Sequence, residues 1–378
     1  MRILHCSAYH YIRSVCADRV RRVVPERRNR PPLALIIHAA GGLARDGGFA
    51  DLGRRRAWDA GSLVQPYSVC KPFVAVCALR LVEAGRLELD APVQRYWPEF
   101  RAPATVRHVL SHQAGVVMLD RPVPAGAFYD WDYLSGLLAA QEPSWEPGAG
   151  HGESALFYGH LVGELVRRVD GRGVGRFVRE EICGPSGLEF AFGLNPAQQV
   201  RAVDLTGLDD AFRAALMSGR PALYRRAVTN PPGAHDGAVV NSAAWRAAEI
   251  PAINGHGTAR ALADFYHALS AGRLLSPGML AEAVIPLCAG PDRVSGYDNA
   301  WGLGFGIDDD GYGMGGLGGS YGGTSTAGGY TIGFVTGSVG NHDRANALES
   351  VLRNCLGLPP GPWPPPIPVS TEVRRPTR

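Results

Sequence analysis

Strand-like sequence lies near both ends of this 378-residue chain, and helical sequence fills the middle. The apolar run LALIIHAA at residues 33–40 is followed by a Gly-Gly turn and a second extended run, which predicts a β-hairpin. Glycine-rich, strand-like sequence returns at residues 301–340. One sheet can use strands from both ends if the helical middle leaves it and returns. We therefore predict an α/β plus all-α fold, in which an antiparallel sheet flanked by helices carries an inserted helical domain.

The expected boundaries follow from the same pattern. We place the sheet domain in residues 1–75 and 255–357, and the helical insertion in residues 76–254. Helical spacing of apolar residues over residues 8–24 predicts a helix ahead of the first strand. The tail, residues 358–378, is rich in proline and has no means of packing, so we expect it to be disordered.

Composition predicts a globular protein that binds neither nucleic acid nor a membrane. Hydrophobic residues make up 46% of the chain and charged residues 19%, a balance that supports a packed core. The net charge of +3 is small, and the basic cluster at residues 19–30 is interrupted by Glu26 and lacks aromatic residues. No apolar run reaches the length of a membrane helix. We expect a small-molecule substrate as partner, and nothing in the sequence specifies an oligomeric state.

Cysteine and histidine spacing gives no sign of a metal site. The seven cysteines are scattered and form no C-x-x-C pair, so neither a disulfide framework nor a zinc knuckle is supported. His108 and His112 have the spacing of a zinc-binding helix, but Val109 stands where that motif has Glu, and no third ligand is evident. We expect no metal and no cofactor. The N-terminus lacks the pattern of a secretory signal, and a reducing cytoplasm fits the cysteine usage.

The stretch PYSVCKPF contains two residues that can act together in catalysis, Ser68 and Lys71. Lys71 is the single lysine among 38 Lys and Arg residues. Pro66 leads into an apolar helix, and residues three apart on a helix share a face, so the amine can reach the serine hydroxyl. Lysine readily loses its charge on burial, whereas arginine stays protonated. We interpret Ser68 as a nucleophile with Lys71 as its proton-transfer partner; the alternative is a surface lysine that follows a serine by chance.

Longer segments around this pair resemble the class C β-lactamase-like serine hydrolases, within the SxxK penicillin-binding-protein superfamily. The resemblance extends over about residues 30–357 and is carried by GSLVQPYSVCKPFVAVCALRLVEAGRLELDAPVQRYWPEF, TVRHVLSHQAG, WEPGAGHGESALFYGHLVGELVRRVDGRGVGRFVREEICGPSGLEF and PAINGHGTARALADFYHAL. That family also holds carboxylesterases, D-aminopeptidases and transacylases. The resemblance implies a β-lactamase/transpeptidase-like fold, with Ser68 as nucleophile and Lys71 as its partner at the domain interface.

The second motif of the family is altered in this chain. Counting from Pro147-Gly148, the place of the Tyr in Tyr-x-Asn or Tyr-Ser/His-x falls on Glu153. The family Tyr is assigned to proton transfer, but a glutamate has a reference pKa of about 4.3 against about 10 for tyrosine, and it stabilises a neighbouring ammonium. Two hypotheses stay open: Glu153 is the base, or it is a solvated residue and the Tyr function is lost. Tyr158 and Tyr67 are further candidates to replace the tyrosine.

The third motif of the family, Lys-Thr-Gly or His-x-Gly, is matched best by Met314-Gly315-Gly316, so its cation is missing. In the family this cation steadies a substrate carboxylate. Its loss argues against β-lactams and D-Ala-D-Ala peptides and favours a neutral ester, amide or thioester. The N–H of Leu317 is the family's candidate for the second oxyanion donor, beside that of Ser68. The expected substrate-binding residues are Tyr67, Tyr158, Met314, Gly316 and Leu317.

Other sequence motifs give weaker evidence for a catalytic site. Residues 318–322 match the G-x-S-x-G nucleophile elbow around Ser320, but strand-like sequence follows where an elbow needs a helix. His112 in LSHQAG matches a family position near the site and is more simply structural, and His151 lies close to Glu153 in sequence.

The combined prediction is a serine acyl-enzyme catalyst, an esterase or transacylase, with Ser68, Lys71 and Glu153 as catalytic residues. By analogy with the family's transacylases, its place is in secondary metabolism. The alternative is a catalytically inactive or repurposed protein. Such a protein binds a ligand in the cleft, or it uses Lys71 and Glu153 for non-hydrolytic acid/base chemistry such as a cyclisation.

Overall fold

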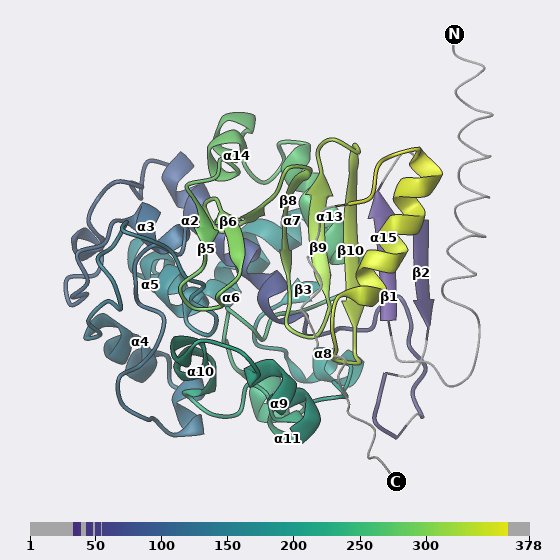
Figure 1. The fold of residues 1–378 in the computed structure, drawn as a ribbon, viewed down its shortest axis with the longest axis horizontal. Coiled ribbons are helices and arrows are strands. Elements are labelled where there is room, and N and C mark those ends of the chain that lie inside the picture. The colour runs from purple at the N-terminus through teal and green to yellow at the C-terminus, as the bar shows by residue number, and fades with distance from the viewer. Residues whose placement is uncertain (1–32, 39–42, 48–49, 54, 362–378) are drawn as a thin grey trace.

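The computed structural model describes four segments of the chain, residues 33–38, 43–47, 50–53 and 55–361. The helix expected at residues 8–24 lies outside the described residues, as do residues 362–378 of the proline-rich tail. The described segments form an antiparallel sheet with helices packed on it and a largely helical part beside it (Figure 1). This is the fold class predicted from the sequence, while the domain boundaries stay a prediction.

Eight strands form one antiparallel sheet in the order β2-β1-β10-β9-β8-β7-β6-β5. β1 and β2 make the expected hairpin, with Leu33 opposite Gly47, and β1 also pairs with β10. The N-terminal hairpin therefore completes a sheet whose other strands come from the C-terminal part of the chain. The strands of this sheet are β1 (Leu33–His38), β2 (Leu43–Gly47), β5 (Cys288–Pro291), β6 (Asp298–Trp301), β7 (Gly306–Ile307), β8 (Gly311–Gly315), β9 (Tyr321–Ser325) and β10 (Tyr330–Thr336). A separate pair is formed by β3 (Phe190–Ala191) and β4 (His256–Gly257).

Strand β10, with the sequence YTIGFVT, is an interior strand of the sheet. All seven of its residues are buried, because helices cover both faces of the strand. On one face Ile332 and Phe334 pack with Leu348 of α15 (Asp343–Leu356). On the other face Gly333 lies so close to α13 (Ala259–Ser270) that an added Cβ would stand 2.2 Å from the Ala259 carbonyl oxygen. The alternation of side chains along a strand thus gives each helix its own contact row.

Helix α2 (Lys71–Glu83) is buried along most of its length. Its sequence KPFVAVCALRLVE is apolar on nearly every face, and ten of its thirteen side chains are buried. A helix that is apolar all round packs as a core element rather than as a surface helix. Phe73 is stacked between Phe190 and Phe265, with ring centroids 3.8 and 3.9 Å away. The helix that starts at Lys71 is therefore fixed by packing along its whole length.

The remaining helices fill the segment between β2 and β5, apart from α15 at the end of the described chain. α5 packs against α2, α3 and α4. In the described part of the chain, no helix is both long and apolar enough to cross a membrane. These helices are α3 (Val106–Leu110), α4 (Trp131–Ala139), α5 (Tyr158–Asp170), α6 (Val174–Phe177), a π-helix (Val178–Cys183), α7 (Gly184–Ser186), α8 (Pro196–Arg201), α9 (Asp210–Met217), α10 (Ala222–Thr229), α11 (Gly237–Val240), α12 (Ala243–Ala247) and α14 (Pro277–Ala283). Three short 3-10 helices also lie in the described part of the chain, at Tyr67–Cys70, Val93–Arg95 and Ala125–Tyr129.

Gly316, directly after β8, sets how closely the sheet approaches the start of α2. A Cβ at this position would lie 1.9 Å from the Pro66 carbonyl oxygen and 3.1 Å from a methyl of Val69. A side chain at position 316 would clash with backbone atoms, so the backbone of one of the two segments would have to shift. Glycine at position 316 therefore allows the end of β8 to lie against the turn that leads into α2.

Replacing Gly316 by alanine should lower the free energy of unfolding by about 1–3 kcal/mol, because either β8 or the turn at Pro66 has to move. The control is Gly136→Ala on α4, where an added Cβ meets no atom within 4 Å. That change should raise the free energy of unfolding by about 0.5–1 kcal/mol through helix propensity. Chemical denaturation of both variants measures the difference, and equal stabilities would contradict the close approach.

Candidate active site

The turn that carries Ser68 is held in a strained backbone conformation. Tyr67 has φ 52°, in the left-handed region that costs a non-glycine residue on the order of 1–3 kcal/mol. Its surroundings hold it there, because the ring is buried and the hydroxyl donates to the Ala234 carbonyl at 3.1 Å. The 3-10 turn Tyr67–Cys70 runs straight into α2, so Ser68 and Lys71 share a face as their spacing predicts. The side chain of Ser68 lines a cavity.

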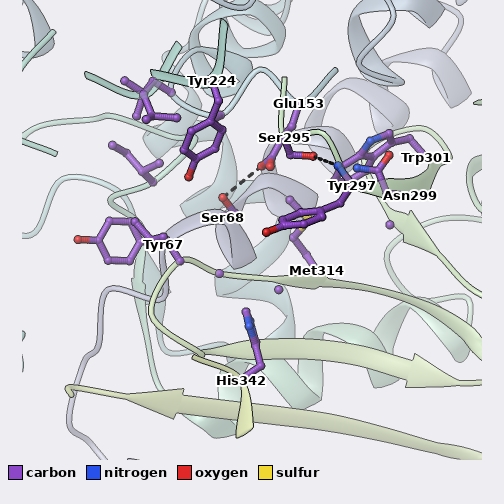
Figure 2. A pocket seen from close by; sticks show the side chains of 18 of the residues that line it. Tyr67, Ser68, Glu153, Tyr224, Ser295, Tyr297, Asn299, Trp301, Met314 and His342 are labelled. Atoms are coloured by element: carbon purple, nitrogen blue, oxygen red, sulfur yellow. Dashed lines mark hydrogen bonds between the residues drawn. The ribbon is translucent and has the colours of Figure 1, made fainter. Parts of the chain in front are cut away.

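Three side chains form a closed set of contacts at this cavity. Lys71 Nζ donates to Ser68 Oγ at 2.6 Å and to Glu153 Oε1 at 2.9 Å. Ser68 Oγ lies 3.4 Å from the same Glu153 oxygen, to which it donates (Figure 2). The Lys71 side chain is 0% exposed and that of Glu153 is 25% exposed. The serine oxygen therefore lies between a buried cation and a carboxylate that can accept its proton.

The Glu153 carboxyl is ionised in this set of contacts. Burial acts to raise the pKa of its carboxyl, but the Lys71 charge and the hydrogen bonds from Lys71 and Ser68 outweigh burial and lower the pKa. At neutral pH the group is a carboxylate with an oxygen directed at the serine hydroxyl. Of the two hypotheses for Glu153, the geometry agrees with a base beside Ser68 and not with a solvated side chain.

Asp292 fixes the backbone of Glu153 and was not found by sequence reasoning. Its side chain is 1% exposed, and its Oδ2 accepts the Glu153 N–H at 2.8 Å and the Asn299 amide at 3.2 Å. Its Oδ1 accepts the N–H groups of Val294 and Ser295 at 2.9 and 2.7 Å. The two hydrogen bonds from Val294 and Ser295 form an Asx-type turn, and the sequence PDRVSGY is compatible with such a turn. The bond to Glu153 joins segments far apart in the chain, and no local pattern signals it.

Backbone donors for an oxyanion stand on the sheet side of Ser68. The Ser68 N–H belongs to the first turn of a helix, where N–H groups lack intrahelical partners. The Leu317 N–H makes no hydrogen bond to another residue in the part of the chain that the structure describes. Leu317 and Gly316 both line the cavity, as does the buried side chain of Met314. These are the positions expected for the substrate-binding edge of the strand.

The cavity above Ser68 has a volume of about 350 Å³ and an extensive apolar wall. Arg220 also lines it, with its guanidinium carbon 4.8 Å from the ring centroid of Tyr224 and 4.2 Å from that of Tyr297. Sequence reasoning missed these three residues, because nothing in the segments around α10 or β6 marks them. The apolar wall includes Leu156, Leu216, Val228, Ile253, Met314 and Leu317.

Neither tyrosine proposed as a substitute for the family tyrosine has a free hydroxyl. Tyr158 is fully buried at the start of α5, is not among the cavity-lining residues, and donates to the Leu110 carbonyl at 3.1 Å. Tyr67 lines the cavity, but its hydroxyl is bound to Ala234. Burial raises the pKa of both phenols well above the ordinary tyrosine value. Tyr158 is placed to support the fold, and Tyr67 to shape the turn at Ser68.

The two histidines near the site have supporting contacts. His112 accepts the Ser154 N–H at 3.2 Å, and its ring packs on Tyr158 and Trp301. Burial lowers the pKa of His112 to about 3, so its ring is neutral. His151 Nε2 lies 2.9 Å from Asn299 Oδ1. Among the described residues, no group of three or more His, Cys, Asp or Glu side chains could hold a metal ion.

Comparison with known proteins places this geometry in a family. The β-lactamase family model matches residues 18–353, and the chain belongs to that family. The esterase/β-lactamase LipL of Mycobacterium tuberculosis is 34% identical over 237 residues, which cover 60% of this chain and 54% of LipL. Esterase EstB of Burkholderia gladioli is 32% identical over 165 residues, covering 37% of this chain and 41% of EstB. The match thus spans about half of each curated relative or less.

The overall fold has a solved counterpart. The crystal structure of a family VIII carboxylesterase superposes on this chain with a TM-score of 0.79 at 30% identity, and covers 92% of this chain and 97% of the other. The resemblance stated from the motifs is therefore confirmed at the level of family and fold.

The ion pair of Lys71 and Glu153 should be strongly coupled in stability. Glu153→Gln leaves the buried Lys71 charge without its partner, which should lower the free energy of unfolding by about 3–5 kcal/mol. In Lys71→Met/Glu153→Gln the buried charge is gone, so the double variant should be more stable than Glu153→Gln alone. Denaturant titration of the two single variants and the double variant gives the coupling energy.

The control for this cycle is Glu88→Gln, which removes an exposed partner of Arg95. It should change the free energy of unfolding by less than about 0.5 kcal/mol. Strictly additive effects of the Lys71 and Glu153 substitutions would contradict the buried pair.

Proposed function

We propose that the protein is a serine acyl-enzyme catalyst, an esterase or transacylase that acts on a small neutral ester, amide or thioester. The observation that carries the proposal is the contact set in which Ser68 Oγ lies 2.6 Å from Lys71 Nζ and 3.4 Å from Glu153 Oε1. A serine hydroxyl becomes a useful nucleophile when a base takes its proton, and this arrangement supplies one. The names of the relatives, esterase and carboxylesterase, agree with this class of reaction.

In the proposed acylation, Ser68 Oγ attacks the substrate carbonyl carbon while its proton passes to Glu153. The Lys71 ammonium stabilises the developing negative charge on Oγ. Because the Lys71 side chain is shielded from water, this electrostatic interaction is weakly screened. The new oxyanion accepts hydrogen bonds from the backbone N–H groups of Ser68 and Leu317. Asp292 keeps Glu153 in reach of the hydroxyl throughout.

The cavity supports a compact and neutral acyl group. Its apolar wall favours a hydrocarbon chain over a charged one. Met314 occupies the position at which the family carries a cation for a substrate carboxylate, so a β-lactam loses that contact. A volume of about 350 Å³ suits a small molecule.

The second half of the reaction decides between hydrolysis and transfer. Water gives an esterase, and an alcohol or amine acceptor gives a transacylase. A place in secondary metabolism belongs to the same proposal, by analogy with the transacylases of the family. A cytoplasmic location is also part of it, because Cys70, Cys77 and Cys183 are free as well as buried.

The experiment is an intact-mass measurement after exposure to a fluorophosphonate, which Ser68 Oγ should attack with loss of fluoride. The wild-type protein should gain one adduct and Ser68→Ala none. Ser295→Ala is the matched control, because Ser295 also lines the cavity, and it should label like the wild type. No adduct on the wild type from pH 5 to 9 would overturn the proposal and favour ligand binding or a non-hydrolytic use of Lys71 and Glu153.

A further inference from the structure

The proposed reaction has to deliver the proton taken from Ser68 to the leaving group. An alkoxide leaving group is a strong base and needs a proton as the tetrahedral intermediate collapses. Lys71 is 0% exposed, and its ammonium is engaged by Ser68 and Glu153. Glu153 holds the proton taken from Ser68 and lies beside the nucleophile. A donor on the cavity side of the scissile bond would have to come from another side chain.

Two phenols face this space. Tyr224 of α10 and Tyr297 ahead of β6 line the cavity, and Figure 2 shows the hydroxyl of each on the side of its ring that is nearer to Ser68. Within the part of the chain that the structure describes, neither hydroxyl has a hydrogen-bond partner. The hydroxyls of Tyr67 and Tyr158, in contrast, are bound to backbone carbonyls. The cavity therefore contains phenol donors that the fold itself does not use.

Arg220 distinguishes these phenols from ordinary surface tyrosines. Its guanidinium lies against both rings, at 4.8 Å from the centroid of Tyr224 and 4.2 Å from that of Tyr297. Its Nη1 also donates to the Ser295 carbonyl at 3.1 Å, which ties the α10 side of the cavity to the β5–β6 loop. A cation at this distance stabilises a phenolate that forms transiently. The cluster thus holds the ring in place and supports loss of its proton.

Tyr224 is the better placed of the two. Tyr297 is 38% exposed, so its hydroxyl competes with water, whereas Tyr224 is partly buried. Burial raises the pKa of Tyr224 to about 12 against the opposing effect of Arg220, so the phenol is protonated at neutral pH. The charge of Glu153 also raises the pKa of Tyr224, which places the two groups within electrostatic reach. In Figure 2, Tyr224 and Glu153 lie on the same side of Ser68, opposite His342.

We propose that Tyr224, held by Arg220, is the catalytic acid that protonates the leaving group when the acyl-enzyme forms. This assignment rests on the proposed acyl-enzyme reaction and adds a residue to it. Ser68 Oγ forms a bond to the carbonyl carbon, and its proton moves to Glu153. As the C=O bond re-forms, the bond to the leaving oxygen breaks and that oxygen takes the Tyr224 proton. The proton on Glu153 then returns to the phenolate, which restores both groups.

Esters that share one acyl group but differ in the leaving group test this role. 4-Nitrophenolate leaves without a proton, whereas ethoxide needs one. Tyr224→Phe should keep kcat/KM for 4-nitrophenyl butyrate within about threefold of wild type and lower kcat/KM for ethyl butyrate by about 100-fold. Loss of a merely structural contact would lower both values together. The fluorophosphonate labelling rate of Ser68 should also stay within about threefold, because fluoride leaves unprotonated.

Tyr297→Phe is the matched control, since it removes the other phenol against the same Arg220. It should change kcat/KM for the two esters in parallel, so that their ratio stays within about threefold of the wild-type ratio. An equal loss on both esters in Tyr224→Phe, or a selective loss in Tyr297→Phe, would overturn the assignment while wild-type labelling and turnover leave the acyl-enzyme proposal standing. A wild-type protein that neither labels at Ser68 nor cleaves either ester would overturn both.

Discussion

The buried ammonium of Lys71 requires a carboxylate to balance its charge, and Glu153 provides that carboxylate. The arrangement of the site follows from this ion pair. Lys71 is fixed by the packing of α2, so its partner has to come to it. Glu153 does so at 2.9 Å, and Asp292 holds the backbone of Glu153 from the β5–β6 loop. An unpaired charge at this depth would cost several kcal/mol, so the pair is a condition for the fold as well as for the chemistry.

The same pair contains one of the two residues at which this chain departs from the family motifs, and Met314 is the other. In the proposed reaction, a carboxylate in place of a tyrosine changes the base from a phenol to an ionised acid and leaves no phenol at position 153. Tyr224 supplies a phenol from a different element, across the cavity, where it can act on the leaving group rather than on the nucleophile. With Met314 in place of the family cation, the cavity offers an acyl group an apolar wall. These differences are the basis for proposing a neutral substrate rather than the β-lactams for which the family is named.

Sequence reasoning succeeded where geometry is local. The spacing of Ser68 and Lys71 on one helical turn determines that their side chains meet, and apolar runs predicted the sheet and the buried helix α2. The motif count singled out Glu153 but left open whether it faces Ser68, and it could not show that the Tyr158 hydroxyl is bound to Leu110. Asp292 and Tyr224 were missed because their contacts join distant segments. Such contacts depend on how the helical part packs on the sheet, which no short pattern encodes.

The most direct measurement is the pH dependence of the second-order rate of Ser68 labelling by a fluorophosphonate, in the wild type and in Glu153→Gln. The folded-state pKa of Glu153 is lowered from its ordinary 4.5, so the carboxylate base is present at all higher pH values and is lost only below that value. The account predicts a wild-type rate that is level from pH 7 to pH 5 and falls at more acidic pH, and a much slower Gln variant without this acidic limb. A Gln variant with the wild-type rate and profile would contradict the role of Glu153 as the base.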